Sequence, residues 1–268
     1  MKPLHYIRAF RGIMVRELYR FVRQRDRFFS ALVRPLVWLF VFAAGFRSTL
    51  GMGITPPYET YILYEVYIAP GLLGMIQLFN GMQNSLSMVY DREMGSMKTL
   101  LISPLPRSFL LTSKLMAGVV VSILQAYTFL LVAWFYGIEA PLRGYVTVLP
   151  ALVLSGLMLG ALGLLLSSLI RQLENFAGVM NFVIFPMFFM STALYPLWKL
   201  QESSVLLTRL AELNPFSQAV ELIRFALYGR FNGYACAYTA AALAAFLVFA
   251  ILGYNPSKGM MQKKGGGS

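Results

Sequence analysis

The sequence predicts an all-α membrane protein with six transmembrane helices, an N-terminal amphipathic interfacial helix, a short cytoplasmic helix and an exterior helical hairpin before the last span. Of its 268 residues, 58% are hydrophobic and 13% are charged, whereas a soluble domain has about a quarter of charged residues. Several apolar runs exceed the roughly 20 residues that a helix needs to cross the hydrocarbon core. We therefore expect little or no separate soluble domain.

The net charge of +12 could indicate binding to nucleic acid, but the basic residues cluster beside apolar runs, which favours contact with membrane lipid. Cys236 is the single cysteine and His5 the single histidine. The sequence therefore excludes an intrachain disulfide, a cysteine-based metal site and histidine chemistry inside the membrane. We expect no metal site and no catalytic residue in this chain.

Residues 1–27 are too charged for a signal peptide. Drawn as a helix, they place apolar side chains on one side and arginines mostly on the other, which is typical of a helix lying on anionic lipid. Contact with a cytoplasmic partner is a compatible alternative. The apolar residues are Ile7, Phe10, Met14, Leu18 and Phe21.

The rest of the chain, residues 28–254, alternates apolar and polar segments. We expect spans at residues 28–50, 61–89, 109–136, 145–170, 176–195 and 235–253. Arg34 lies near the start of the first span, where its side chain can reach the interface. Gly156 and Gly160 in the fourth span predict close helix packing, within one subunit rather than between subunits. Residues 255–268 form a short basic tail, and Gly265–Ser268 resembles an artificial linker.

The second expected span carries three amides on one stripe, at i, i+3 and i+7: Gln77, Asn80 and Asn84. Amides that face lipid would lack hydrogen-bond partners, so the stripe is expected to face protein or water. Two interpretations stay open, which are hydrogen bonds between helices and the lining of a substrate cavity. Asn181, Phe185 and Phe189 in the fifth span are further cavity candidates.

Residues 91–108, between the second and third expected spans, form the polar segment with the clearest internal pattern. It opens with acidic and basic residues, breaks at Gly95, continues with leucines at roughly helical spacing and stops at Pro104 and Pro106. A short helix joining two spans offers a surface to a protein outside the membrane, although an ordinary loop would also fit.

Residues 196–234 are too polar to span a membrane and too apolar for a free loop. Asn214 is a plausible N-cap and Pro215 a first helical residue, and Gly229 ends the helix. One side of this helix is apolar, whereas Ser217, Gln218, Glu221 and Arg224 fill the other side. We interpret the segment as a surface or re-entrant helical hairpin. With six spans both termini share a side, and at least 14 of the 23 lysines and arginines lie there against six on the other, which predicts cytoplasmic termini.

The sequence lacks the residues that would let the chain energise transport by itself. No ionisable residue sits at the middle of an expected span, which argues against proton or sodium coupling. The phosphate-binding pattern G-x-x-x-x-G-K-[ST] is absent, and no nucleophile and base are paired. A transporter of this kind depends on an energy source supplied by another polypeptide.

At this point the chain resembles the permease subunits of ABC exporters of the ABC-2 type, over essentially its whole length. Two patterns carry the resemblance. The first, after the second span, is Glu93, Gly95, Leu100, Leu101 and Pro104; the second is Pro186, Pro196, Asn214-Pro215 and Arg224. Many members have a Ser-Gly pair before the second proline, where this chain has Ser191-Thr192, so the local backbone is expected to differ.

The resemblance implies an exporter in a bacterial-type inner membrane, with two permease subunits, expected as a homodimer, and two separate ATPase subunits that hold ATP and Mg²⁺. It also implies that the chain is not an enzyme by itself. The substrate would be an amphipathic molecule, a lipid-like molecule, a glycan or a drug; the alternatives are a membrane enzyme or a scaffold acting on lipid-linked envelope components. The residues implied in ATPase coupling are Asp91, Arg92, Glu93, Gly95, Thr99, Leu100 and Pro104.

Overall fold

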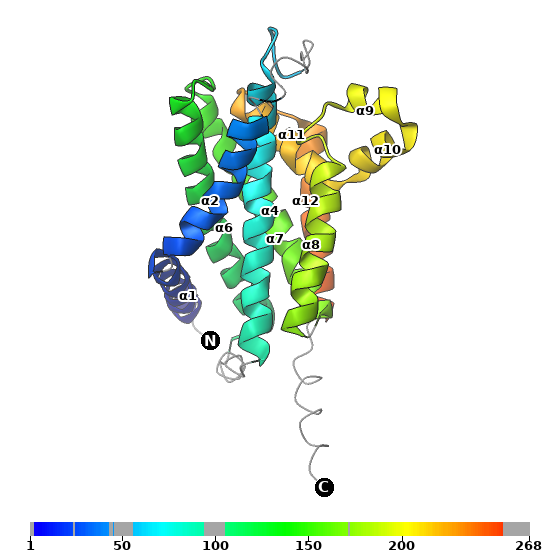
Figure 1. The fold of residues 1–268 in the computed structure, drawn as a ribbon. Helices are drawn as coiled ribbons and strands as arrows, with labels where there is room; N and C mark the ends of the chain where they lie inside the picture. Colours follow the sequence, from blue (N-terminus) through cyan, green and yellow to red (C-terminus); the bar gives the residue numbers. More distant parts are fainter. Residues whose placement is uncertain are drawn as a thin grey trace.

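Helix α7 (Gly144–Leu169) lies at the centre of the structure. In this computed structural model it packs against α4 (Tyr64–Glu93), α6 (Arg107–Phe135), α11 (Pro215–Leu227) and α12 (Gly233–Gly253) (Figure 1). The described residues are 3–23, 25–42, 45, 56–93, 105–170 and 172–253. An apolar helix that is covered on most sides needs no polar face, and α7 has none.

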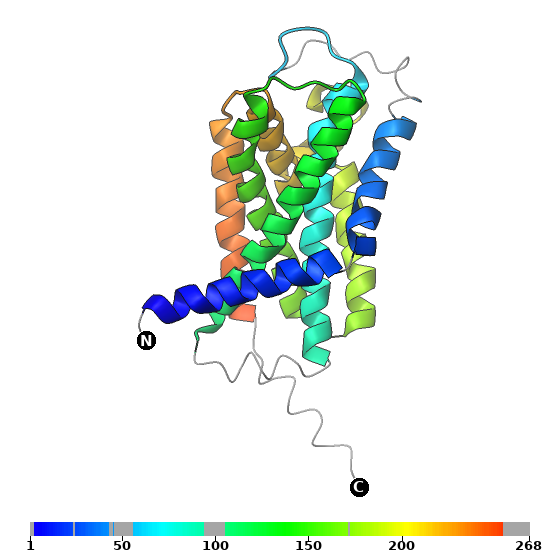
Figure 2. The same cartoon turned by 90° about the vertical axis from the view of Figure 1, so that its left-hand side faces the viewer.

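The remaining helices surround this centre. Helix α1 (Pro3–Arg23) runs across the long helices and packs against α6 (Figure 2). Helix α2 (Arg25–Val37) continues into a π-helical turn, η1 (Trp38–Phe42), and both contact α4. Helix α8 (Leu173–Phe189) contacts α4 as well. The short helices α9 (Leu197–Ser203) and α10 (Val205–Leu213) project at the end of the bundle where α11 lies.

Among the described residues, three helices are long and apolar enough to cross a membrane: Ser108–Phe135 within α6, α7 and α12. Two shorter apolar helices, Ala31–Val41 and Leu173–Phe189, accompany them. Helix α4 is longer than any of these but less apolar, since it carries Gln77, Asn80, Gln83 and Asn84, and it is not among them. The structure thus agrees with an all-helical membrane protein, while the count of six spans stays a prediction.

Helices α4 and α7 approach each other through glycines. A Cβ atom on Gly81 would lie 2.9 Å from the carbonyl oxygen of Leu159, and one on Gly163 would lie 2.7 Å from the carbonyl oxygen of Gly81. No side chain fits at either position without displacing backbone. The close packing predicted for Gly160 and Gly156 is confirmed within one chain, since their neighbours are Leu115 and Gln77.

The ends of two helices follow from single glycines. Gly137 after α6 has φ +89° and Gly229 after α11 has φ +68°, a region that glycine adopts without steric cost. At each end the residue after the glycine donates its backbone N–H to the carbonyl oxygen five positions earlier, from Ile138 to Ala133 and from Arg230 to Phe225. These bonds satisfy helix carbonyls that would otherwise lack partners. The start of α11 at Pro215, capped by Asn214, and its end before Gly229 are as the sequence predicts.

Candidate functional site

The amide stripe of α4 lies against α6 and α7. The buried Gln77 donates to the carbonyl oxygen of Leu152 at 2.6 Å and accepts from the hydroxyl of Ser155 at 2.5 Å. Asn80 donates to the side-chain oxygen of Gln125 on α6. These contacts tie α4 to both neighbouring helices at half its length.

One turn further, Asn84 donates to the backbone carbonyl oxygen of Lys114 at 3.4 Å. All three amides therefore make hydrogen bonds between helices, which is the first of the two interpretations that the sequence left open. The lining of a substrate cavity by Gln77, Asn80 and Asn84 stays a prediction.

The candidates on α8 lie differently, because Asn181, Phe185 and Phe189 are exposed in the single chain. The rings of Phe185 and Phe189 stack with centroids 6.2 Å apart. The ring of Phe189 also meets Trp38 of η1 at 5.8 Å. The structure therefore brings together the aromatic candidates of α8 and Trp38 of η1, whereas Gln77 is buried against α7.

Three of the seven predicted coupling residues lie in the last turn of α4. The helix continues through Asp91, Arg92 and Glu93, so the first three residues of the predicted loop 91–108 are its last turn. Gly95, Thr99, Leu100 and Pro104 lie outside the described residues.

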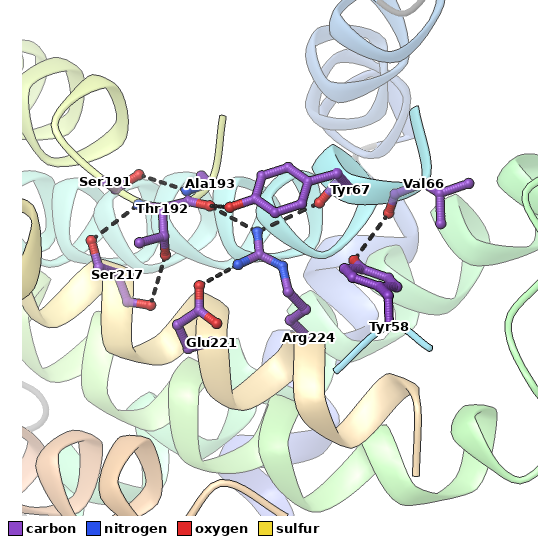
Figure 3. A network of polar contacts seen from close by, with 9 residues as sticks. All are labelled: Tyr58, Val66, Tyr67, Ser191, Thr192, Ala193, Ser217, Glu221 and Arg224. Carbon is purple, nitrogen blue, oxygen red and sulfur yellow. Dashed lines mark hydrogen bonds and ion pairs between the residues drawn. The ribbon is translucent and has the colours of Figure 1, made fainter. Parts of the chain in front are cut away.

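A second polar site lies at the opposite end of α4, around Arg224 of α11 (Figure 3). Arg224 is buried, with 1% of the residue exposed. Its guanidinium pairs with Glu221 one turn earlier, donates to the carbonyl oxygen of Thr192 at 2.7 Å and lies 4.1 Å from the ring centroid of Tyr67. One cation thus joins α11, α4 and the turn after α8.

The same turn is held by further hydrogen bonds. The Tyr67 hydroxyl donates to the carbonyl oxygen of Thr192 at 3.0 Å. The backbone N–H of Thr192 donates to the Ser217 hydroxyl at 3.2 Å, and the Thr192 hydroxyl donates to the Ser217 carbonyl at 3.4 Å. Tyr67 of α4 and Arg224 of α11 therefore both donate to the Thr192 carbonyl. Ser217 of α11 also bonds the backbone N–H and the hydroxyl of Thr192.

Pro70 leaves one backbone carbonyl of α4 without its usual helical donor. A proline inside a helix has no N–H to donate to the residue four positions back, which here is Val66. The Tyr58 hydroxyl donates to that Val66 carbonyl at 3.5 Å, and Arg224 donates to the next carbonyl, of Tyr67, also at 3.5 Å. The cis peptide bond between Pro56 and Pro57 immediately precedes Tyr58.

The charge state of this site follows from its neighbours. Burial lowers the pKa of Arg224, but Glu221, Tyr67 and Tyr58 together raise it above the ordinary value for arginine. Burial also raises the pKa of the Tyr58 hydroxyl, which therefore stays protonated. The site holds a permanent cation beside a carboxylate, and within the described residues no group of three or more acidic, histidine or cysteine side chains could hold a metal ion.

Sequence reasoning missed the burial of this site. It placed Ser217, Gln218, Glu221 and Arg224 on an outward polar face of α11, whereas Ser217, Gln218 and Arg224 are buried and Glu221 is half-buried. Their spacing was the available signal, since Ser217, Glu221 and Arg224 follow one another at i, i+4 and i+7 and so form one stripe.

Arg34 also differs from expectation. The sequence placed it near an interface, yet its guanidinium lies 3.7 Å from the ring centroid of Phe79. Phe79 is two residues from Gln77, whose partners Leu152 and Ser155 lie near the middle of α7. Arg34 therefore stands at about half the height of the bundle.

Comparison with known proteins places these features in context. Residues 8–228 match the family model of the ABC-2 type transporter. A chain of Cyanophora paradoxa named as a transport permease, ycf38, is 27% identical over 219 residues, which cover 80% of this chain and 72% of that one. A chain of Escherichia coli strain K12 named as a probable multidrug ABC transporter permease, YbhR, is 29% identical over 170 residues, which cover 62% of this chain and 45% of that one.

The family match covers most of the chain and includes α4, the amide stripe and the Arg224 site. It extends from α1 to the residue after α11. The chain is a multi-pass membrane protein and a transport permease subunit, and it belongs to the ABC-2 type transporter family.

Proposed function

We propose that the chain is the membrane subunit of an ATP-driven exporter, in which separate ATPase subunits bind ATP and Mg²⁺ and supply the energy. The family implies association with an ABC ATPase subunit. The proposal adds that two copies of this chain form a homodimer in a bacterial-type inner membrane, that both termini are cytoplasmic and that an amphipathic substrate moves outward.

The observation that carries the proposal is the unbroken course of α4 from Tyr64 to Glu93. One end of α4 leads into the predicted coupling loop 91–108, and the other end holds Tyr67 against Arg224. A helix of 30 residues is about 45 Å long at 1.5 Å per residue. A displacement applied at Glu93 is therefore passed through one stiff element to the far end of the bundle.

The amides of α4 determine which neighbours follow this displacement. Gln77 and Asn80 bind α7 and α6 directly, so these helices are coupled to α4 at half its length. A rival membrane enzyme would need ionisable groups clustered at one interface. The most buried ion pair among the described residues, Arg224–Glu221, is already bonded to backbone and aromatic neighbours. A scaffold without transport would not need coupling to an ATPase.

The test is ATPase stimulation in a reconstituted complex of the permease with its ATPase subunit. The double variant Glu93→Arg with Gly95→Pro should fold in detergent and abolish the stimulation of ATP hydrolysis by the permease. Glu139→Arg, a charge reversal on an exposed side chain between α6 and α7, is the control and should leave stimulation intact. Stimulation that persists in the double variant would remove residues 91–108 from the coupling role, and failure of any ATPase to co-purify would favour the scaffold.

A further inference from the structure

Arg34 is a cation on an otherwise apolar face of the bundle. Its side chain is exposed in the single chain, and its guanidinium lies over the face of the Phe79 ring. No acidic side chain pairs with it in the described part of the chain. An arginine over an aromatic ring is held by cation–π attraction, but that contact leaves the edge of the guanidinium free to donate hydrogen bonds.

The level of Arg34 along the bundle bears on the role of this cation. It stands level with the Gln77 contacts at the middle of α7, which is one of the helices able to cross a membrane. Ionisable residues at such a depth face the interior of a bundle or a water-filled cavity, and they mark the path of a substrate or ion. An arginine at an interface would need no such explanation.

Aromatic side chains extend from Arg34 toward α8. Trp38 follows Arg34 by four residues, which places both on the same side of the helix. Its ring contacts Phe188 at 5.4 Å and Phe189 at 5.8 Å, and Phe189 stacks on Phe185. Helix α4 lies between α2 and α8 in the view of Figure 1 and contacts both. Trp38 links the Arg34 side to the rings of α8, and Arg34, Trp38, Phe189 and Phe185 together are called the aromatic face.

We propose that this face binds the anionic headgroup of an amphipathic transported molecule. Arg34 pairs with a phosphate or carboxylate, and the apolar part of the molecule lies on Trp38, Phe189 and Phe185, of which Phe185 is 50% and Phe189 is 43% exposed. The guanidinium fork matches the geometry of both anionic groups and forms charge-assisted hydrogen bonds with them. A site with one placed charge and an aromatic lining has the composition of a small-molecule binding site. The assignment rests on the proposed transport function, but its test needs no ATPase.

The experiment uses Trp38 as the reporter. The chain has three tryptophans, and Trp134 and Trp198 are both exposed. The full-length protein with Trp134→Phe and Trp198→Phe is placed in phosphatidylcholine nanodiscs and titrated with a dibrominated single-chain alkyl phosphate, which quenches tryptophan fluorescence on contact. The dibrominated alcohol of the same length is the neutral probe.

The alkyl phosphate should quench Trp38 at about tenfold lower concentration than the alcohol, and Arg34→Gln should remove that difference. Arg34→Lys should retain part of it, and Arg143→Gln, which changes an exposed arginine before α7, should retain all of it. Identical quenching curves for the parent and Arg34→Gln would overturn the proposal.

Three further arms identify the bound species. Inorganic phosphate at the same concentration should not relieve the quenching, and full relief would overturn the role of the apolar face. Equal quenching by a dibrominated diacyl phosphatidic acid would assign the site to a bilayer lipid and overturn its assignment to a transported molecule. A change of oligomeric mass in Arg34→Gln would assign Arg34 to a contact between subunits, with the same consequence.

Discussion

The guanidinium of Arg224 donates a 2.7 Å hydrogen bond to the backbone carbonyl oxygen of Thr192, and the two residues are 32 positions apart in the chain. The Tyr67 hydroxyl donates to the same carbonyl from α4. The turn after α8 is thus fixed by groups from two other helices. Its stability depends on a buried cation whose neutralising partner is Glu221.

Removal of that cation should destabilise the protein strongly. Arg224→Met keeps much of the side-chain volume but leaves Glu221 half-buried without its partner and the Thr192 carbonyl with one donor fewer. Breaking a buried ion pair from one side costs about 3–5 kcal/mol. The measurement is thermal unfolding in detergent, followed by size-exclusion chromatography.

Two variants separate the charge from the packing. The double variant Arg224→Met with Glu221→Met should lose clearly less stability than Arg224→Met alone, because no unpaired charge remains. Arg143→Met, at an exposed arginine, should be close to neutral. If the double variant is as unstable as the single one, the bonds to Thr192 and Tyr67 matter more than the ion pair.

The side chain of Asn214 has two roles that substitution can separate. Its oxygen accepts from the N–H of Phe216 and caps α11, while its amide nitrogen donates to the carbonyl oxygens of Met187 and Met190 at 2.8 Å each. At a solvent-exposed helix start, aspartate caps as well as asparagine does. Here Asn214→Asp turns a donor into a carboxylate oxygen that faces two carbonyls.

Asn214→Asp should therefore be at least as destabilising as Asn214→Ala, by about 1–3 kcal/mol, because it leaves two partly buried carbonyls without this donor. Ser204→Asp provides the comparison, since Ser204 caps α10 by accepting from Leu207 and its hydroxyl donates to no other described residue. The measurement is the thermal midpoint of Asn214→Asp, Asn214→Ala and Ser204→Asp. An Asn214→Asp protein as stable as the parent would contradict the role of Asn214 as a donor to the two carbonyls.

Gly71 should tolerate no side chain. A Cβ atom there would lie 2.4 Å from the carbonyl oxygen of Ala193 and 2.8 Å from its Cα atom. Since both are backbone atoms, Gly71→Ala must push α4 away from the turn that Arg224 and Tyr67 hold. Overpacking of this kind costs about 1–3 kcal/mol.

Gly178→Ala on α8 is the matched control, because nothing lies within 4 Å of its added Cβ. In a helix interior, alanine is favoured over glycine by about 1 kcal/mol, so Gly178→Ala should be neutral or stabilising. The order of the two thermal midpoints checks the geometry, and the opposite order would show that α4 and the turn are not in contact.

The sequence predicts the local features of this fold well where one residue determines them. Asn214-Pro215 marks the start of α11, Gly229 marks its end, and the glycines of α7 mark a close helix contact. It does not predict the burial of Arg224. A polar stripe on an amphipathic helix normally faces water, and here its partners, Tyr67 and Thr192, lie 157 and 32 positions away.

The candidate site was predictable in part. The stripe of Gln77, Asn80 and Asn84 was correctly expected to avoid lipid, because an amide in hydrocarbon needs a partner. Which partner it would find depended on Ser155, Gln125 and Lys114, and no periodicity along one helix encodes that. The depth of Arg34 was missed for the same reason, since it depends on Phe79 of another helix.

The glycine contact between α4 and α7 limits how the bundle can change shape. Backbone meets backbone at Gly81 and Gly163, so no side-chain rotamer can change to let these helices slip, and they must tilt as a rigid pair. The seams that α2 and α8 form with α4 instead contain long side chains such as Leu36 and Phe188, which can repack. Any opening of the molecule is therefore expected along those two seams, on either side of the aromatic face.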